Sequence, residues 1–193
     1  MRTLIAIFVA AAGGSLLTGT AWGQETNYYL PYPATKLEAF DTNTDTVIIK
    51  ATAPIGTVPA RGGDVGVRCR EITDVGSGRH ASGIIVDLSF GGQAADTMLV
   101  DYDELDSLLD GLEYLGALDW SVTPLPGFDA VYTTKGGFRA AAVGSRRTGN
   151  IEFALRSVRV HTAPLLLSRD QLGQVRSLVQ QGKAKLDSLH KEK

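Results

Sequence analysis

Basic residues are concentrated in one part of the chain, between residues 129 and 169. Only two acids, Asp129 and Glu152, lie in this segment, against seven bases: Lys135, Arg139, Arg146, Arg147, Arg156, Arg159 and Arg169. A surface of one charge sign attracts groups of the opposite sign. We therefore predict a basic sheet face that binds an anionic partner through Arg139, Arg156 and Arg159. The alternative is a solvated surface that has no partner.

Acidic residues are concentrated just before this segment, between residues 96 and 119, where no Lys or Arg occurs. The acids are Asp96, Asp101, Asp103, Glu104, Asp106, Asp110, Glu113 and Asp119. They could pair with the basic half of another molecule, or could simply stabilise the start of a helix through its dipole. Nothing in their sequence neighbourhood predicts the burial that would raise a carboxyl pKa for acid–base chemistry.

Other reactive residues are few. Cys69 is the single cysteine and alternates with Val65 and Val67, which predicts a buried side chain. The three histidines, His80, His161 and His190, are too scattered for metal ligands, so we expect no metal and no cofactor. Phosphate loops, nucleophile elbows and dinucleotide motifs do not occur. We therefore expect a non-enzymatic module. One alternative is an enzyme of unfamiliar type with a site near Cys69 and His80, and another is a carrier of a small anionic ligand.

Residues 1–23 have the pattern of a secretory signal peptide. Arg2 gives the positive start, residues 4–12 are apolar, and small residues follow up to Gly23. The apolar run is short for a membrane span. We expect an exported protein, periplasmic or extracellular, with no stable membrane anchor after cleavage. Its partner would be a protein or an anionic envelope component, and the oligomeric state stays open.

The remaining chain predicts an irregular N-terminal arm, residues 24–46, whose tyrosines dock on one globular α+β domain, residues 47–193. Gly136-Gly137 predicts a type I′ hairpin turn. Residues 54–63 are expected to form a loop, and the strand pattern is expected to bulge or break near Arg156-Ser157. Trp120, in the linker 116–127, is expected to pack between two halves. The predicted strands span 47–53, 64–73, 82–90, 97–100, 129–135, 138–144, 150–155 and 162–167.

A helix is predicted after each group of four strands, so the order of elements occurs twice along the chain. Asp101 with Glu104, and Ser168 with Gln171, each have the spacing of a capping box at a helix start. Leucine and valine then recur at helical spacing after each box. We predict a β4-α-β4-α fold built from two pseudo-repeats, 47–116 and 128–190, with antiparallel sheets. Each helix is expected to cover a face of its own sheet.

Several blocks together resemble an uncharacterised family of small bacterial exported proteins. These blocks are TKLEAFDTNTDTVIIKATAPIGTV, CREITD, VDYDELDSLLDGLEYL, YTTKGGFR and LLLSRDQLGQVRSLVQQGKAKLDSL. The resemblance implies no activity and no site residues. The β4-α-β4-α order is also similar to the tandem layout of Whirly-type single-stranded DNA-binding proteins, as a fold analogy. Phe138 and Tyr132 are the nearest candidates for base stacking, but export argues against a nucleic-acid partner.

Overall fold

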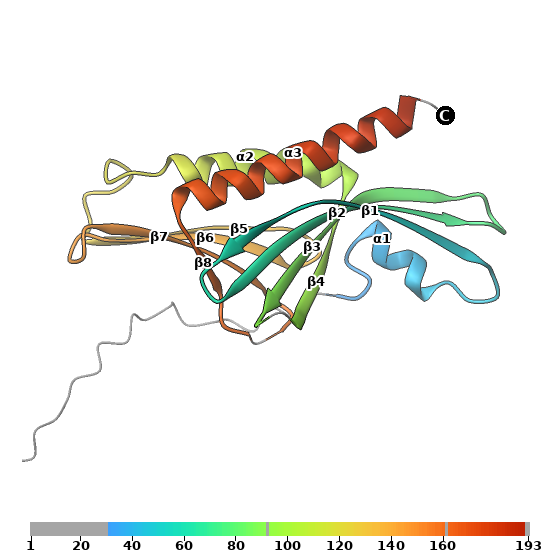
Figure 1. The fold of residues 1–193 in the computed structure, drawn as a ribbon, viewed down its shortest axis with the longest axis horizontal. Helices are drawn as coiled ribbons and strands as arrows, with labels where there is room; N and C mark the ends of the chain where they lie inside the picture. Colours follow the sequence, from blue (N-terminus) through green and yellow to red (C-terminus); the bar gives the residue numbers. More distant parts are fainter. Residues whose placement is uncertain (1–30, 92, 161, 192–193) are drawn as a thin grey trace, which may run out of the picture.

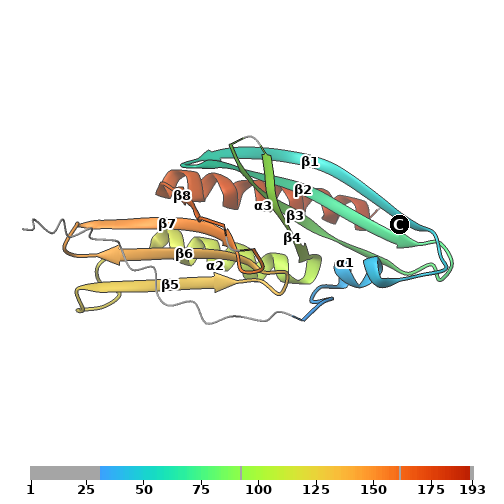
Figure 2. The same cartoon turned by 90° about the horizontal axis from the view of Figure 1, so that it is seen from below.

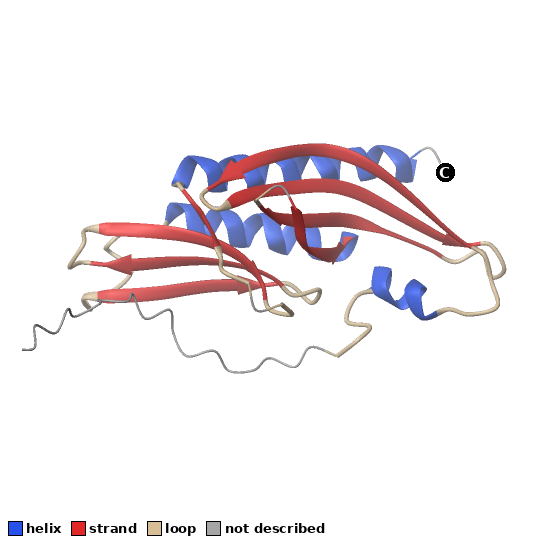
Figure 3. Cartoon of the chain, turned by 60° about the horizontal axis from the view of Figure 1, so that its bottom comes forward, coloured by secondary structure: helices blue, strands red, loops and turns tan. Residues whose placement is uncertain are grey.

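A computed structural model describes residues 31–91, 93–160 and 162–191. The predicted signal peptide and the first part of the predicted arm, residues 24–30, lie outside the described residues. Two antiparallel four-stranded sheets follow each other along the chain, and each is followed by a helix (Figures 1 and 3). This arrangement confirms the β4-α-β4-α prediction.

The first sheet has the strand order β1-β2-β3-β4, and the second has the order β5-β6-β7-β8. In the first sheet these strands are β1 (Ile48–Ala60), β2 (Gly63–Asp74), β3 (His80–Phe90) and β4 (Gln93–Asp101). In the second they are β5 (Gly127–Thr133), β6 (Phe138–Ser145), β7 (Asn150–Ser157) and β8 (Leu165–Leu167). A 3-10 turn, η2 (Tyr102–Glu104), leads from β4 into α2 (Leu105–Ala117), and α3 (Arg169–Lys191) follows β8.

The two long helices are exchanged between the sheets. Gly111 of α2 lies over β5, where a Cβ atom would come within 2.5 Å of the Tyr132 ring. Gly182 of α3 lies over the first sheet, and its carbonyl accepts a hydrogen bond from the Cys69 thiol of β2 at 3.4 Å. The prediction that each helix covers its own sheet is therefore wrong. Both sheets contribute to one continuous core, so the two halves are one folding unit.

Strand composition explains how closely the helices approach. On β6 the residues that face α2 are Phe138, Ala140 and Ala142, all fully buried. The two alanines leave room for the α2 backbone, while Leu105, Leu108 and Leu112 of α2 fill the space between helix and sheet. Burying side chains of this size stabilises the fold by about 1.5–3 kcal/mol each.

Two elements differ from their predictions, and one predicted boundary agrees with the structure. β1 continues through the predicted loop to Ala60, with an irregularity between Pro54 and Gly56, because Pro54 has no N–H to donate to the sheet. The β5–β6 turn runs from Thr134 to Gly137, and only Gly137 of the two glycines has a positive φ, 91°. A type I′ turn needs positive φ at both central residues, so that prediction is wrong. β7 ends at Ser157, at the predicted break.

One of the two predicted capping boxes is confirmed. Ser168 Oγ accepts from the Gln171 N–H at 3.1 Å, and Gln171 Oε1 accepts from the Ser168 N–H at 2.7 Å. Asp101, by contrast, makes no capping hydrogen bond to its own helix. Its carboxylate accepts instead from the backbone N–H groups of Lys36 and Leu37, at 2.7 and 3.1 Å. Asp101 therefore caps a helix that lies far upstream in the sequence.

That upstream helix is α1 (Lys36–Ala39), which continues into the 3-10 turn η1 (Phe40–Thr42). It has a complete capping box of its own, Thr35 with Glu38. Leu37 and Phe40 pack with Ile72 on the face of the first sheet that α3 leaves uncovered. The prediction of an irregular arm is wrong over these residues. Of the arm's tyrosines, Tyr32 is 60% exposed rather than docked, and Tyr28 and Tyr29 lie outside the described residues.

Trp120 packs on the second half only. Its ring meets Phe128 edge to face at 5.6 Å, and the Arg146 guanidinium lies 5.2 Å from the ring centre. The predicted position between the halves is therefore wrong. None of the helices in the described part of the chain is long and apolar enough to cross a membrane.

Asp74, at the end of β2, holds the turn that follows it. Its carboxylate accepts hydrogen bonds from the Thr46 hydroxyl at 2.6 Å, the Ser77 hydroxyl at 2.7 Å and the Gly76 N–H at 3.0 Å. These donors, the Thr46 hydroxyl first, lower the pKa of Asp74 from 3.8 to about 2. The charged form is therefore the one that the folded state stabilises.

The stability that Asp74 contributes should depend on pH. The contribution is complete above the unfolded pKa, and it is lost as the pH falls from 3.8 through the folded pKa of about 2. We expect the difference in Tm between the wild type and Asp74→Asn to be largest at pH 5 and above and to shrink between about pH 4 and pH 2. Calorimetry across that range measures it, and a constant difference would contradict the assignment.

Candidate functional site

The outer face of the second sheet is the side turned away from α2 and α3 (Figure 2). Alternate residues of β5, β6 and β7 point to this side, because their neighbours Phe128, Ala140 and Phe153 point into the core. Residues that lie opposite each other on neighbouring strands share a face. The register therefore arranges the outer face in three successive rows of side chains, which we name the basic, apolar and acidic rows.

The basic row is Thr133, Arg139 and Arg156. Arg139 of β6 is paired directly with Arg156 of β7, and Thr133 of β5 completes the row. Both arginines are half-buried. Two like charges placed directly opposite on a sheet repel each other, and an anion held between them relieves that repulsion. The sheet register thus brings two of the three predicted binding arginines together.

Arg159, the third predicted arginine, has a different position. Its guanidinium pairs with the buried Glu38 carboxylate at 2.7 Å, with a second contact at 3.1 Å. Glu38 is only 5% exposed, and it also closes the capping box of α1. Arg159 therefore neutralises a buried acid and attaches α1 to the loop after β7. It does not extend the basic row.

The apolar row runs across the middle of the face. It consists of Val131, Ala141, Ala154 and Leu166, aligned across all four strands. Val131, on the edge strand β5, is 40% exposed, whereas Ala154, on the inner strand β7, is buried. Small and branched side chains make this row flat.

The acidic row lies on the far side of the apolar row. Asp129 and Glu152, both exposed, flank Val143 of β6. The prediction of a basic sheet face therefore needs correction, because the only two acids of residues 129–169 point to the same side as Arg139 and Arg156. The strand alternation already places all four residues on one face, and this was the signal that sequence reasoning missed.

Two other bases of the segment donate hydrogen bonds to backbone carbonyls. Arg146 donates to the carbonyls of Trp120, Thr123 and Leu125, at 2.8, 3.0 and 3.1 Å. Arg169 donates to the carbonyls of Gly116 and Leu118 at the end of α2. A cation at this position satisfies carbonyls that have no partner within the helix and is favoured by the helix dipole. The seven bases therefore do not form one patch.

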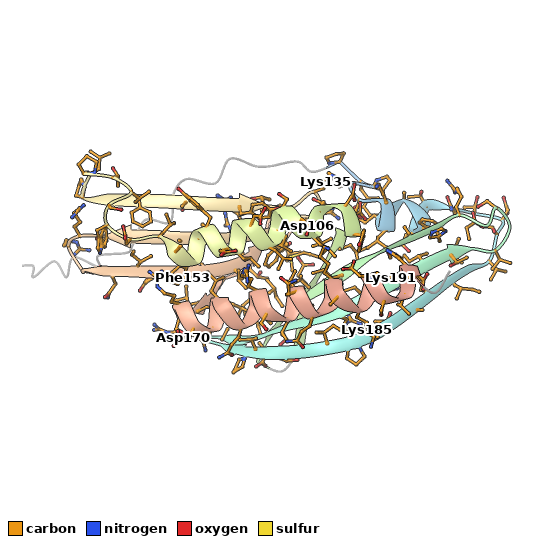
Figure 4. The ribbon with its side chains drawn as sticks, turned by 90° about the horizontal axis from the view of Figure 1, so that it is seen from above. Asp106, Lys135, Phe153, Asp170, Lys185 and Lys191 are labelled. Carbon is orange, nitrogen blue, oxygen red and sulfur yellow. The ribbon has the colours of Figure 1, made fainter. Side chains whose placement is uncertain are left out.

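The acidic helix α2 finds basic partners within its own chain. α2 and α3 lie side by side (Figure 4). Arg176 of α3 pairs with Glu113 at 2.6 Å, and Lys183 lies 3.5 Å from Asp106. Two of the three acids of α2 therefore already have a basic partner within the chain. Exposed pairs of this kind contribute about 0–1 kcal/mol each, so they orient the helices more than they stabilise them.

The residues of the enzyme alternative do not form a site. Cys69 is 3% exposed and points at α3, and burial raises the pKa of its thiol. A thiol with a raised pKa is a poor nucleophile at neutral pH. His80 is exposed and pairs with Thr73, four residues along β2 from Cys69, which is roughly 13 Å. Within the described residues, no three His, Cys, Asp or Glu side chains are placed to hold a metal ion.

A candidate pocket for the carrier alternative lies on the first sheet; it has a volume of about 280 Å³ and is lined by Thr57, Gly66, Arg68, Asp87 and Ser89 among others. Arg68 is its cation, and both of its contacting nitrogens bind the Asp87 carboxylate, at 2.6 and 2.7 Å. Asp87 also accepts from the Thr97 hydroxyl at 2.9 Å. Because the guanidinium is already neutralised in this way, the pocket does not favour an anion.

The two candidates for base stacking belong to the protein interior. Phe138 is 1% exposed. Tyr132 lies under α2, and its hydroxyl donates to Ser107 at 3.0 Å. Neither ring offers a free face for a nucleobase, in contrast to the stacking platforms of single-strand binders.

Comparison with protein-family models, with curated proteins and with solved structures finds no match for this chain. A functional assignment therefore depends on the geometry of the described surfaces. The outer face of the second sheet is the surface on which charged and apolar side chains are arranged in the most regular way.

Proposed function

We propose that this protein is an exported, non-enzymatic binding module that receives a carboxylate-bearing partner on the outer face of its second sheet. The observation that carries the proposal is the basic row: Arg139 and Arg156 lie directly opposite each other, next to the apolar row. Export is part of the proposal because residues 1–23 have a signal-peptide pattern.

The chemistry of arginine favours a carboxylate. A guanidinium group offers paired N–H donors in a planar fork that matches the two oxygens of a carboxylate. The strands that hold the two arginines are fixed from below by Phe138 and Leu155, both fully buried. A rigid framework reduces the entropy that is lost on binding. The apolar row beside the arginines adds contact area for the partner's uncharged parts.

Retention on immobilised poly-L-glutamate tests the proposal. We expect the wild type to be retained at low salt and Arg139→Glu/Arg156→Glu to pass through, because the reversed charges repel the polymer. The matched control is Arg147→Glu/Lys185→Glu, which changes the net charge equally at two exposed positions outside the face. Elution of the Arg139/Arg156 variant at the same salt concentration as the wild type would overturn the proposal, and so would equal losses in both double variants.

A further inference from the structure

The outer edge of β1 is open over the first half of the strand. β1 is the outermost strand of the first sheet, and β2 pairs with its inner edge (Figure 2). The outer edge is closed at its far end, where Arg61 exchanges two backbone hydrogen bonds with Leu166 of β8, at 2.8 and 3.2 Å. Within the described residues, the outward backbone groups of residues 48–54 have no hydrogen-bond partner.

One hydrogen bond identifies the outward groups. The Val75 N–H donates to the Val47 carbonyl at 3.0 Å. Backbone groups alternate between the two edges of a strand, so the odd-numbered residues of this part of β1 bond to β2. Ile48, Lys50 and Thr52 therefore direct their N–H and carbonyl groups outward.

This part of the edge has little protection against pairing with another strand. Free edges are usually guarded by charged side chains or by proline. Lys50 is the one charged residue between positions 47 and 54, and its ammonium is paired with Asp41. Pro54, which has no N–H, ends the run of outward donors. The aliphatic side chains of Val47 and Ile49 are 65% and 55% exposed.

We infer that a second copy of the chain pairs with this edge, antiparallel and about a two-fold axis at Ala51, so that the first sheets of two copies form one continuous sheet. The inference is independent of the proposed function, because it concerns the edge of the first sheet. In this register Lys50 of one copy lies opposite Thr52 of the other, and Ile48 lies opposite Pro54. A register centred on Lys50 would place two lysines opposite each other, which is destabilising.

A copy of the same strand matches the open edge on both counts, backbone and side chain. Lys50 and Thr52 exchange both backbone hydrogen bonds in each of their two pairings, and each Ile48 N–H meets a proline carbonyl, which makes about six bonds in all. On the other face of the sheet Ile49 lies opposite Ala53, an apolar pair. Because the contact covers only residues 48–54 of each copy, it is smaller than a standard interface, and we expect a reversible dimer at high protein concentration.

Ala51→Cys tests the register by oxidative cross-linking. The two copies of position 51 form a non-hydrogen-bonded pair, whose Cα atoms lie about 4.5 Å apart in an antiparallel sheet, within the range of a disulfide. We expect this variant to become a covalent dimer under mild oxidation. Ile49→Cys is the matched control: the position is also exposed, but its two copies would lie about 14 Å apart. The wild type, whose Cys69 is buried, gives the background.

Thr52→Pro tests the contact without an added cysteine. The change removes an outward N–H and no hydrogen bond between β1 and β2. Thr52→Ala, which keeps the N–H, is its control. In analytical ultracentrifugation at high protein concentration, the wild type and Thr52→Ala should sediment as dimers and Thr52→Pro with half their mass. Circular dichroism checks that the proline variant is folded, and if it is not, the cross-linking result decides.

Three results would overturn the inference. The first is a wild type that stays monomeric at every concentration. The second is cross-linking of Ala51→Cys no greater than that of Ile49→Cys, because random collisions then explain it. The third is a monomer whose Ile48, Lys50 and Thr52 amides are protected from hydrogen exchange, because another segment of the chain then covers the edge.

Discussion

Replacing Gly136 with alanine should lower the free energy of unfolding more than adding a methyl group at any other position of the β5–β6 turn. A Cβ atom at this position would lie 1.9 Å from the Leu99 carbonyl oxygen, and both groups belong to the backbone. The turn of the second sheet approaches β4 of the first sheet here. Because neither backbone can move without separating the sheets, we expect a loss on the order of 3 kcal/mol in the free energy of unfolding. Urea unfolding monitored by circular dichroism measures it.

Gly173→Ala is the matched control. Gly173 is exposed on α3, and an added Cβ would meet no atom within 4 Å. Alanine there should stabilise the protein by up to about 1 kcal/mol, because glycine is a poor helix former. Equal unfolding midpoints for the two alanine variants would contradict the close contact between the sheets.

Asp101→Asn should destabilise α1, although the substituted residue lies at the start of α2. Both oxygens of Asp101 accept backbone N–H groups, from Lys36 and Leu37. An asparagine amide turns one of those acceptors into a donor, which leaves a buried N–H without a partner at a cost of about 1–3 kcal/mol. Hydrogen exchange of the Lys36 and Leu37 amides should accelerate.

The control for this variant is Asp103→Asn. Asp103 pairs with the Lys36 ammonium at 2.9 Å, with both side chains largely exposed. A surface pair of this kind is worth at most about 1 kcal/mol. If Asp101→Asn instead accelerated exchange only at the start of α2, Asp101 would be the local N-cap that its sequence position predicts.

The distance along the chain between bonded partners explains why one capping box was predicted correctly and the other was not. Ser168 and Gln171 bond to each other within three residues, so the sequence pattern contains the whole interaction. Asp101 and Glu104 have the same spacing, but Asp101 caps α1 and Glu104 accepts the Lys135 N–H at 3.0 Å. Both partners come from distant segments, and no local pattern indicates them.

In the candidate site, too, some features follow from the local sequence and others depend on distant segments. In the structure, the alternation of side chains along β6 and β7 places Arg139 and Arg156 on the side away from the core. Their direct pairing, however, depends on the register between the two strands. Arg159 looks equivalent to them in the sequence, yet it binds Glu38, 121 residues away. A buried carboxylate requires a partner, and tertiary packing chose Arg159.

By itself the sequence determined the order of the strands in the two sheets and of the two long helices that follow them. Side-chain periodicity and hydrogen bonds over three or four residues decide these features, and both can be read from neighbours along the chain. Only the tertiary structure decided which sheet each helix covers, that Arg159 binds the buried Glu38, and which side chains lie opposite each other on the outer face. Those outcomes depend on contacts between segments far apart in sequence, such as α3 on β2 and α1 on β4, and local propensity carries no information about them.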